Sequence, residues 1–153
     1  MKIKVEIDEN LPEDEILIRC RNMDEEVMVI QKQVAEAVKS RLQLNVYKGE
    51  TEYYLTLDDI LFFETNGSAV AVHTKSDIFE TKLRLYELEE MLPGFFFRIS
   101  KSAILNTRQV QAVHKNLAGA SEVEFINSHK KVFVSRNYFK AFTEKLEEKR
   151  LRK

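Results

Sequence analysis

The chain has 153 residues, of which 44% are hydrophobic and 32% charged, a composition that fits one globular domain or one domain with a structured extension. No apolar run approaches the roughly 20 residues that span a bilayer, and the alternation of charged and apolar residues after Met1 is unlike a signal peptide. The lone Cys20 excludes an internal disulfide. Because it follows an apolar run, we expect it to be buried, in a cytoplasmic protein.

The net charge of −1 hides a sorting of charge along the chain. Residues 1–40 carry −4, residues 41–94 carry −5 and residues 95–153 carry +8. Such asymmetry favours contact between the last third and a polyanion. A solvated basic C-terminal helix would produce part of the same excess, so charge alone leaves both interpretations open.

Residues 1–42 predict a small strand–strand–helix extension. Residues 2–8 alternate with the period of a strand, Asn10-Leu11-Pro12 interrupts them, and residues 15–20 form a second candidate strand. Asn22 is a candidate cap for a helix over about 23–42, whose apolar positions recur at helical spacing. We expect this extension to serve regulation or dimerisation, because it is too small to bury a core of its own.

Residues 43–153 predict a second domain, mainly β with short helices, an α+β fold. The expected strands cover residues 44–47, 53–57, 61–64, 69–74, 78–82, 110–115, 122–126 and 132–134, with an apolar segment at 95–97. The Asn66-Gly67 pair predicts a type I′ hairpin turn, since both central positions of that turn need positive φ. Short helices are expected over about 84–92, stopped by Pro93-Gly94, and over about 137–150.

Catalytic and metal-binding patterns were sought and none was found. The four glycines are isolated, the three histidines lack metal-ligand spacing, and adjacent acidic pairs such as Asp58-Asp59 point to opposite sides of a regular element. We therefore expect no enzyme activity, no metal, no cofactor and no small-molecule substrate.

Two polar clusters follow apolar segments in the basic third. Ser100-Lys101 follows the 95–99 run, and Ser135-Arg136-Asn137 follows Val134. Both are interpreted as points where a core element meets a helix start, which exposes long donors and offers backbone amides to phosphate oxygens. The alternative is that the serines only cap helices and the basic side chains are solvated.

These segments together resemble the LytTR family of bacterial DNA-binding domains. The resemblance rests on Asp59–Glu64, on Leu85–Glu89 before Phe97–Asn106, and on Val134–Tyr138, and it covers about residues 43–148. It implies a fold of three β-sheets with short helices, whose loops enter successive major grooves of double-stranded DNA without a recognition helix. The family's contacting loops correspond here to Asn66-Gly67-Ser68, to Ser100 and Lys101, and to Arg136 and Asn137. Ser100 stands where many members have histidine.

Roles at the expected interface follow from side-chain chemistry. Arg136 can make a forked contact to guanine, Lys101 can do the same or neutralise phosphate, and Lys130 is either a phosphate contact or a solvated hairpin tip. The remaining candidates are expected to meet phosphate or sugar: Ser100, Arg108, Lys115, Ser135 and Asn137.

The sequence therefore predicts a stand-alone transcription regulator without a receiver domain. The resemblance implies a homodimer on repeated sites and control by a membrane-protein inhibitor. A protein-interaction module that uses the basic third on an acidic protein is the alternative. An RNA-binding role is less favoured, because the aromatic residues lie in apolar runs and do not offer exposed stacking surfaces.

Overall fold

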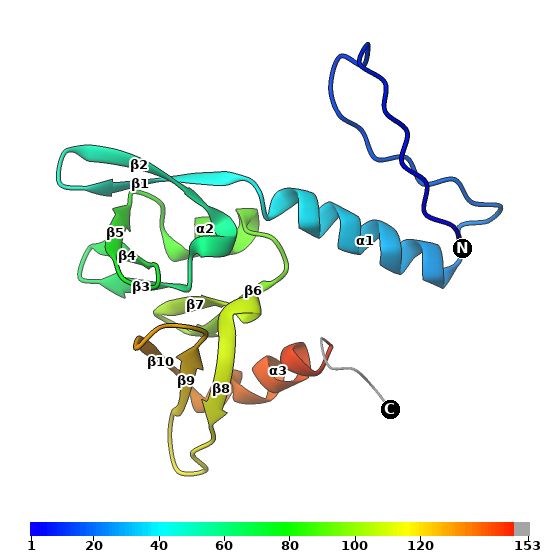
Figure 1. Ribbon diagram of the computed structural model, residues 1–153. Helices are drawn as coiled ribbons and strands as arrows, with labels where there is room; N and C mark the ends of the chain where they lie inside the picture. The colour runs from blue at the N-terminus through cyan, green and yellow to red at the C-terminus, as the bar shows by residue number, and fades with distance from the viewer. Residues whose placement is uncertain (149–153) are drawn as a thin grey trace. The chain divides into compact units, whose positions relative to one another are not determined.

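A computed structural model describes residues 1–148 of the chain (Figure 1). It divides into two compact units, one ending at Val34 and the other beginning at Ala35. The strands are β1 Gln43–Lys48, β2 Thr51–Thr56, β3 Phe62–Asn66, β4 Ala69–His73, β5 Ile78–Thr81, β6 Phe96–Ser100, β7 Ala103–Asn106, β8 Val110–His114, β9 Ser121–Phe125 and β10 Lys131–Val134. The helices are α1 Glu25–Lys39, α2 Leu85–Met91 and α3 Arg136–Glu147, with 3-10 turns at Leu57–Asp59 and Thr107–Gln109.

The two strands predicted at residues 2–8 and 15–20 are not formed. Residues 1–24 have no regular secondary structure, and Figure 1 draws them as a plain tube that folds back on itself. A strand needs a partner for its backbone hydrogen bonds. Within this segment, the Leu11 N–H donates to the Asp8 carbonyl oxygen, which forms a turn and not a strand pair. The prediction of a buried thiol was also wrong, since Cys20 is exposed.

Helix α1 confirms the predicted helix with shifted ends. The Val27 N–H donates to Asp24 Oδ1 at 2.9 Å, so Asp24 acts as the capping residue in place of Asn22. The helix ends at Lys39, before the predicted 42. Its last turn belongs to the second unit, where Glu36 Oε2 accepts a hydrogen bond from the Gly94 N–H at 3.0 Å.

The larger sheet has seven antiparallel strands in the order β2-β1-β5-β4-β3-β7-β6. Strand β3 pairs with β4 on one side and with β7 on the other. It therefore joins the group β2-β1-β5-β4 to the pair β7-β6 in one sheet. The three remaining strands form a second sheet in the order β10-β9-β8. The mainly β fold with short helices is confirmed, but residues 35–148 contain two hydrogen-bonded sheets where the resemblance implied three.

The core of the second unit lies on both faces of the larger sheet. Neighbouring residues of a strand face opposite ways. Phe63 accordingly packs in one apolar cluster with α2, through Leu85 and Leu88. Phe62 packs in the other, with the three-stranded sheet and Phe142 of α3. Each strand and helix predicted with bounds from residue 43 onward is present to within a few residues of its predicted ends, except that residues 149–150 of the predicted final helix lie outside the described range. The helix start expected after Ser100 is absent, because β7 follows there. Over residues 1–148, no helix combines the length and apolar character needed to cross a bilayer.

Candidate nucleic-acid interface

The turn between β3 and β4 is a hairpin turn, as predicted, but its two central residues are one position later than the predicted Asn66 and Gly67, and its conformation differs from the type I′ turn. Asn66 pairs with Ala69, so Gly67 and Ser68 are the loop residues. Gly67 has φ +66°, whereas Ser68 has no positive φ. Positive φ at the first central position alone is typical of a type II′ turn with glycine there. Asn66, Gly67 and Ser68 are all exposed.

The turn between β6 and β7 carries Ser100, Lys101 and Ser102. It joins two strands, so the prediction of a helix start after Ser100 was wrong: residues 103–106 pair with β3 and β6 as a strand. The Ser100 hydroxyl accepts a hydrogen bond from the Ser102 N–H at 3.1 Å and lies 3.2 Å from the Ser102 hydroxyl. Lys101 is exposed at the tip of the turn.

The Arg98 side chain hydrogen-bonds to the backbone of this turn. Its Nε donates to the Ser100 carbonyl oxygen at 2.7 Å and its Nη2 donates to the Lys101 carbonyl oxygen at 2.6 Å. The remaining Nη1 forms an ion pair with Glu89 of α2 at 2.7 Å. The Arg98 side chain is only 21% exposed, so these bonds are partly shielded from water. A guanidinium with all three nitrogens occupied fixes the two carbonyl groups in one arrangement.

The third cluster begins helix α3. Ser135 is the N-cap residue, with φ −69° and ψ 154°, but its side chain makes no capping hydrogen bond. The first N–H groups of a helix have no partner within the helix, and they attract anions. Ser135, Arg136, Asn137 and Ala120 line an open hollow of about 520 Å³. Arg136 and Asn137 are exposed beside those N–H groups.

Two backbone hydrogen bonds join the three clusters into one surface. The Thr65 N–H, next to the β3–β4 turn, donates to the Ser102 carbonyl oxygen at 2.9 Å. The Ser135 N–H donates to the Ile99 carbonyl oxygen at 2.9 Å, which ties the start of α3 to the strand that leads into Ser100. We define the interface edge as Asn66, Ser68, Ser100, Lys101, Ser135, Arg136 and Asn137. The two bonds connect the three segments that carry these seven predicted residues.

Lys130 lies outside the interface edge and is engaged within the protein. Its ammonium lies 3.3 Å from His73 Nδ1 and donates to the Asp77 carbonyl oxygen, so it links the β9–β10 connection to the β4–β5 turn. Burial, and then the nearby charge of Lys130, lowers the pKa of His73 to about 4. His73 is therefore neutral at pH 7, and its ring stacks on Phe62 with centroids 4.1 Å apart.

Arg108 and Lys115 differ in the solvent exposure of their side chains. The Arg108 guanidinium lies over the Phe95 ring, 3.8 Å from its centroid, and is half-buried. Lys115 is exposed at the start of the β8–β9 connection, and its ammonium lies 5.8 Å from the Phe139 ring of α3. The same connection reaches Ala120, which lines the hollow beside Arg136. Lys115 thus lies on the connection that reaches the hollow, whereas Arg108 packs on an aromatic ring.

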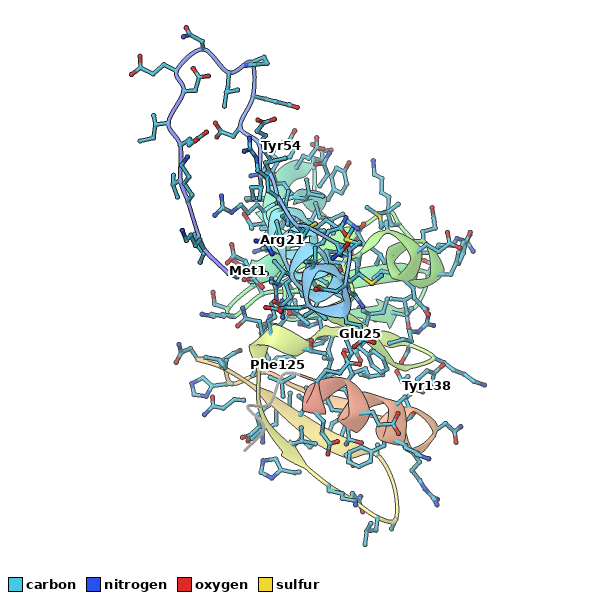
Figure 2. All side chains as sticks on the ribbon, turned by 90° about the vertical axis from the view of Figure 1, so that its right-hand side faces the viewer. Met1, Arg21, Glu25, Tyr54, Phe125 and Tyr138 are labelled. Carbon is cyan, nitrogen blue, oxygen red and sulfur yellow. The ribbon has the colours of Figure 1, made fainter. Side chains whose placement is uncertain are left out.

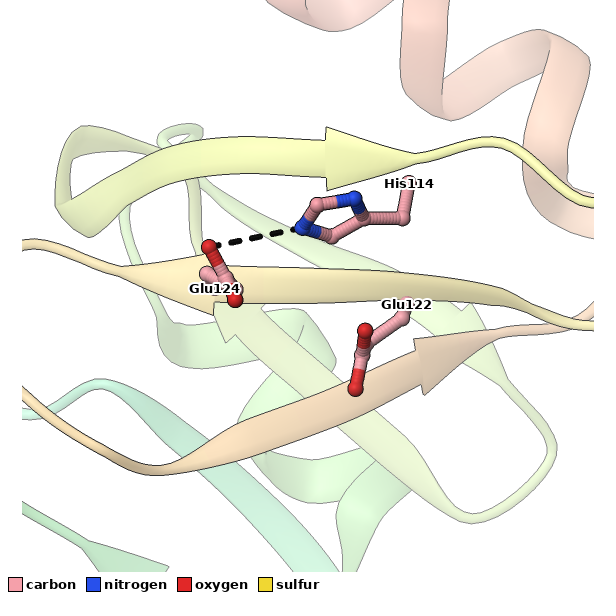
Figure 3. Close-up of side chains that lie close together, drawn as sticks. All are labelled: His114, Glu122 and Glu124. Carbon is pink, nitrogen blue, oxygen red and sulfur yellow. Dashed lines mark ion pairs between the residues drawn. The ribbon is translucent and has the colours of Figure 1, made fainter.

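The outer face of the three-stranded sheet carries a cross-strand charge network that the sequence did not reveal. Figure 3 shows His114 of β8 beside Glu122 and Glu124 of β9, with His114 Nε2 3.4 Å from Glu124 Oε2. The ligand-type atoms of these residues lie within 4.8 Å of one another. The ammonium of Lys131 lies 3.2 Å from Glu122 and 3.9 Å from Glu124, so both carboxylates already have a cation of the protein as neighbour.

Sequence reasoning missed Arg98 and Glu89 as part of the site. The Phe97-Arg98 pair directly before the turn was the available signal, since an arginine at the end of a strand can reach back over the following turn. Its partner on α2 is nine residues earlier, and only the packing of α2 on the sheet brings the two side chains together.

The family model described as the LytTr DNA-binding domain matches residues 50–147. Two relatives from Staphylococcus aureus, described as HTH-type transcriptional regulators in strains NCTC 8325 and MRSA252, are 31% and 30% identical over 146 residues. The aligned region covers 95% of this chain and 98% of each relative.

Among solved structures, the LytTr DNA-binding domain of a Bacillus cereus response regulator superposes with a TM-score of 0.64. It is 20% identical, and the match covers 69% of this chain and 96% of the solved chain. This likeness supports the fold. Within residues 1–148, strands separate α1, α2 and α3 from one another, so no helix–turn–helix is formed despite the names of the relatives.

Proposed function

The chain belongs to the LytTR family of DNA-binding domains, and from that premise we propose that it regulates transcription by gripping double-stranded DNA with the interface edge. The family is a class of DNA-binding domains rather than a class of enzymes. The observation that carries the proposal is the pair of backbone hydrogen bonds that hold the three turns together, from Thr65 to Ser102 and from Ser135 to Ile99.

The interface edge combines two kinds of contact. Lys101 and Arg136 are exposed, and neither side chain forms a hydrogen bond or ion pair with another residue of the range 1–148. Arg136 suits a forked contact to guanine in the major groove, worth about 1–3 kcal/mol of base discrimination. The free N–H groups at the start of α3, together with Asn137 and the serines, suit phosphate oxygens and set the position of the protein on DNA.

Three turns held as one surface can follow the groove without a recognition helix. The Ser100–Ser102 turn is fixed by Arg98, and the start of α3 is fixed by its bond to Ile99. A preorganised surface loses less conformational entropy on binding than three separate loops would lose. We therefore propose sequence reading by Lys101 and Arg136, with phosphate contacts from the surrounding residues and from Lys115.

The partners beyond DNA are part of the proposal. We propose that the chain works in the cytoplasm as a homodimer on repeated sites, and that the acidic residues 1–40 face a protein partner rather than DNA. The resemblance implies that this protein partner is a membrane protein that inhibits the regulator. The protein-interaction module is not favoured, since the family and the relatives are DNA-binding regulators.

Selection of bound sequences from a random duplex pool, followed by binding curves on the selected and a scrambled duplex, tests the proposal. We expect a tighter complex with the selected duplex and a steep loss of affinity with salt on both, because each neutralised phosphate adds roughly 0.9 to the slope of log K against log salt. Failure to enrich any sequence, with an affinity that is flat in salt, would overturn it.

A further inference from the structure

Residues 2–8 leave three apolar side chains in water. Ile3, Val5 and Ile7 are 96%, 83% and 90% exposed. They alternate with charged residues, so an extended chain places all three on one face and the charges on the other. Figure 2 shows the side chains between the labelled Met1 and Arg21 pointing outward from the trace. Residues 2–8 thus have the alternation of a strand but, within residues 1–148, no neighbouring strand to bond to their backbone.

The charges of this segment are arranged so that it complements itself. Lys2 and Lys4 precede Val5, and Glu6 and Asp8 follow it. Antiparallel pairing of two copies about Val5 puts Lys2 opposite Asp8 and Lys4 opposite Glu6, and the same register puts Ile3 opposite Ile7. Opposite charges and apolar pairs across strands both stabilise a sheet, whereas a parallel arrangement would put like charges side by side.

One register within a single chain has the opposite charge pattern. Antiparallel pairing of residues 2–8 with residues 15–21 that aligns Ile7 with Ile16 puts Lys4 opposite Arg19. It also puts Lys2 opposite Arg21 and Asp8 opposite Glu15. Like charges directly opposite each other destabilise a strand pair. That register is therefore unfavourable in a single chain, in which residues 1–24 form no strand.

We propose that residues 2–8 form an antiparallel strand pair with residues 2–8 of a second copy of this chain. The pair has a twofold axis at Val5, and its seven residues are an ordinary strand length. The Lys4–Glu6 ion pair, 2.7 Å within each chain, is exchanged for two symmetry-related Lys4–Glu6 pairs between chains, and two Lys2–Asp8 pairs are added. Ile16 and Leu17 of the same unit are also exposed, at 66% and 68%.

Charge exchange at positions 4 and 6 tests the pairing in the full chain without DNA. In Lys4→Glu, both symmetry-related pairs set carboxylate against carboxylate, and in Glu6→Lys both set ammonium against ammonium. Sedimentation over a concentration series should show dimerisation weakened by about tenfold or more in each variant. An equimolar mixture of the two variants should dimerise again, because one copy is then acidic and the other basic at both positions.

Two variants with the same charge changes elsewhere serve as controls. Lys32→Glu and Glu13→Lys alter exposed residues outside the paired segment and should dimerise like the wild type. A monomeric wild type, variants that dimerise unchanged, or a mixture that fails to recover would each overturn the proposal. Affinity for a duplex carrying one binding site is measured separately on the same variants, so failure of the dimer and failure of DNA binding are distinguishable.

Discussion

The Ser135 N–H donates to the Ile99 carbonyl oxygen at 2.9 Å, and this bond joins the start of helix α3 to the strand that ends in the Lys101 turn. Ile99 is fully buried, so the bond is anchored in the core rather than at the surface. Lys101 and Arg136 therefore extend from a common rigid base, although they are far apart in sequence.

Arg98 is expected to act on DNA binding through the turn that it holds. Arg98→Ala removes two bonds to the carbonyl groups of Ser100 and Lys101, and it should cost about 1–3 kcal/mol of binding free energy on a selected duplex. Affinity for a scrambled duplex should change less, because Lys101 keeps its charge. Glu89→Gln leaves both turn bonds in place and is the matched control, with a smaller effect. Equal losses on the two duplexes would contradict a positioning role.

His73 should make the protein less stable in mild acid. Its pKa is lowered to about 4 in the folded protein from about 6.5, so the unfolded chain takes up a proton that the folded chain excludes. The resulting stabilisation is present above about pH 6.5 and is lost as the pH falls towards about 4. Denaturant midpoints across this range should fall less steeply for His73→Asn than for the wild type. The same dependence of the midpoint on pH in both proteins would show that His73 does not titrate as described.

Lys115 and Lys130 should separate an electrostatic contact from a structural one. Lys115→Ala should weaken binding to all duplexes nearly alike and reduce the salt slope by roughly 0.9, the amount expected for one phosphate. Lys130→Ala removes the link between His73 and the Asp77 carbonyl, so it should lower the unfolding midpoint and leave the salt slope unchanged. A smaller salt slope for Lys130→Ala would contradict its structural role and would show that Lys130 contacts phosphate.

Removal of residues 1–34 should leave a folded domain that binds a single site. The cores around Phe63 and Phe142 lie in the second unit, and the Glu36–Gly94 bond stays with it. Circular dichroism and single-site binding should match those of the full chain, while dimerisation is lost. Loss of cooperative unfolding on truncation would show that the first unit completes the core.

The sequence predicted the second unit well because its signals are local. Alternation, Gly67 at a turn and the apolar spacing of α2 each act within a few residues. The missed features depend on distant partners. The 2–8 strand has the correct alternation but no partner within the chain, and the Arg98–Glu89 pair depends on packing. Lys130 was left open as a phosphate contact or a hairpin tip, because the approach of His73 cannot be seen from spacing.

The most direct test of the interface is the base preference of Arg136→Ala, obtained by selection from the same random pool as the wild type. We expect the variant to lose base preference at one position, where the wild type favours guanine. It should bind the wild-type site about 1–3 kcal/mol more weakly, while its affinity for scrambled duplex changes little. An unchanged base preference, with equal losses of affinity on both duplexes, would show that Arg136 contacts phosphate and would contradict base reading by Arg136.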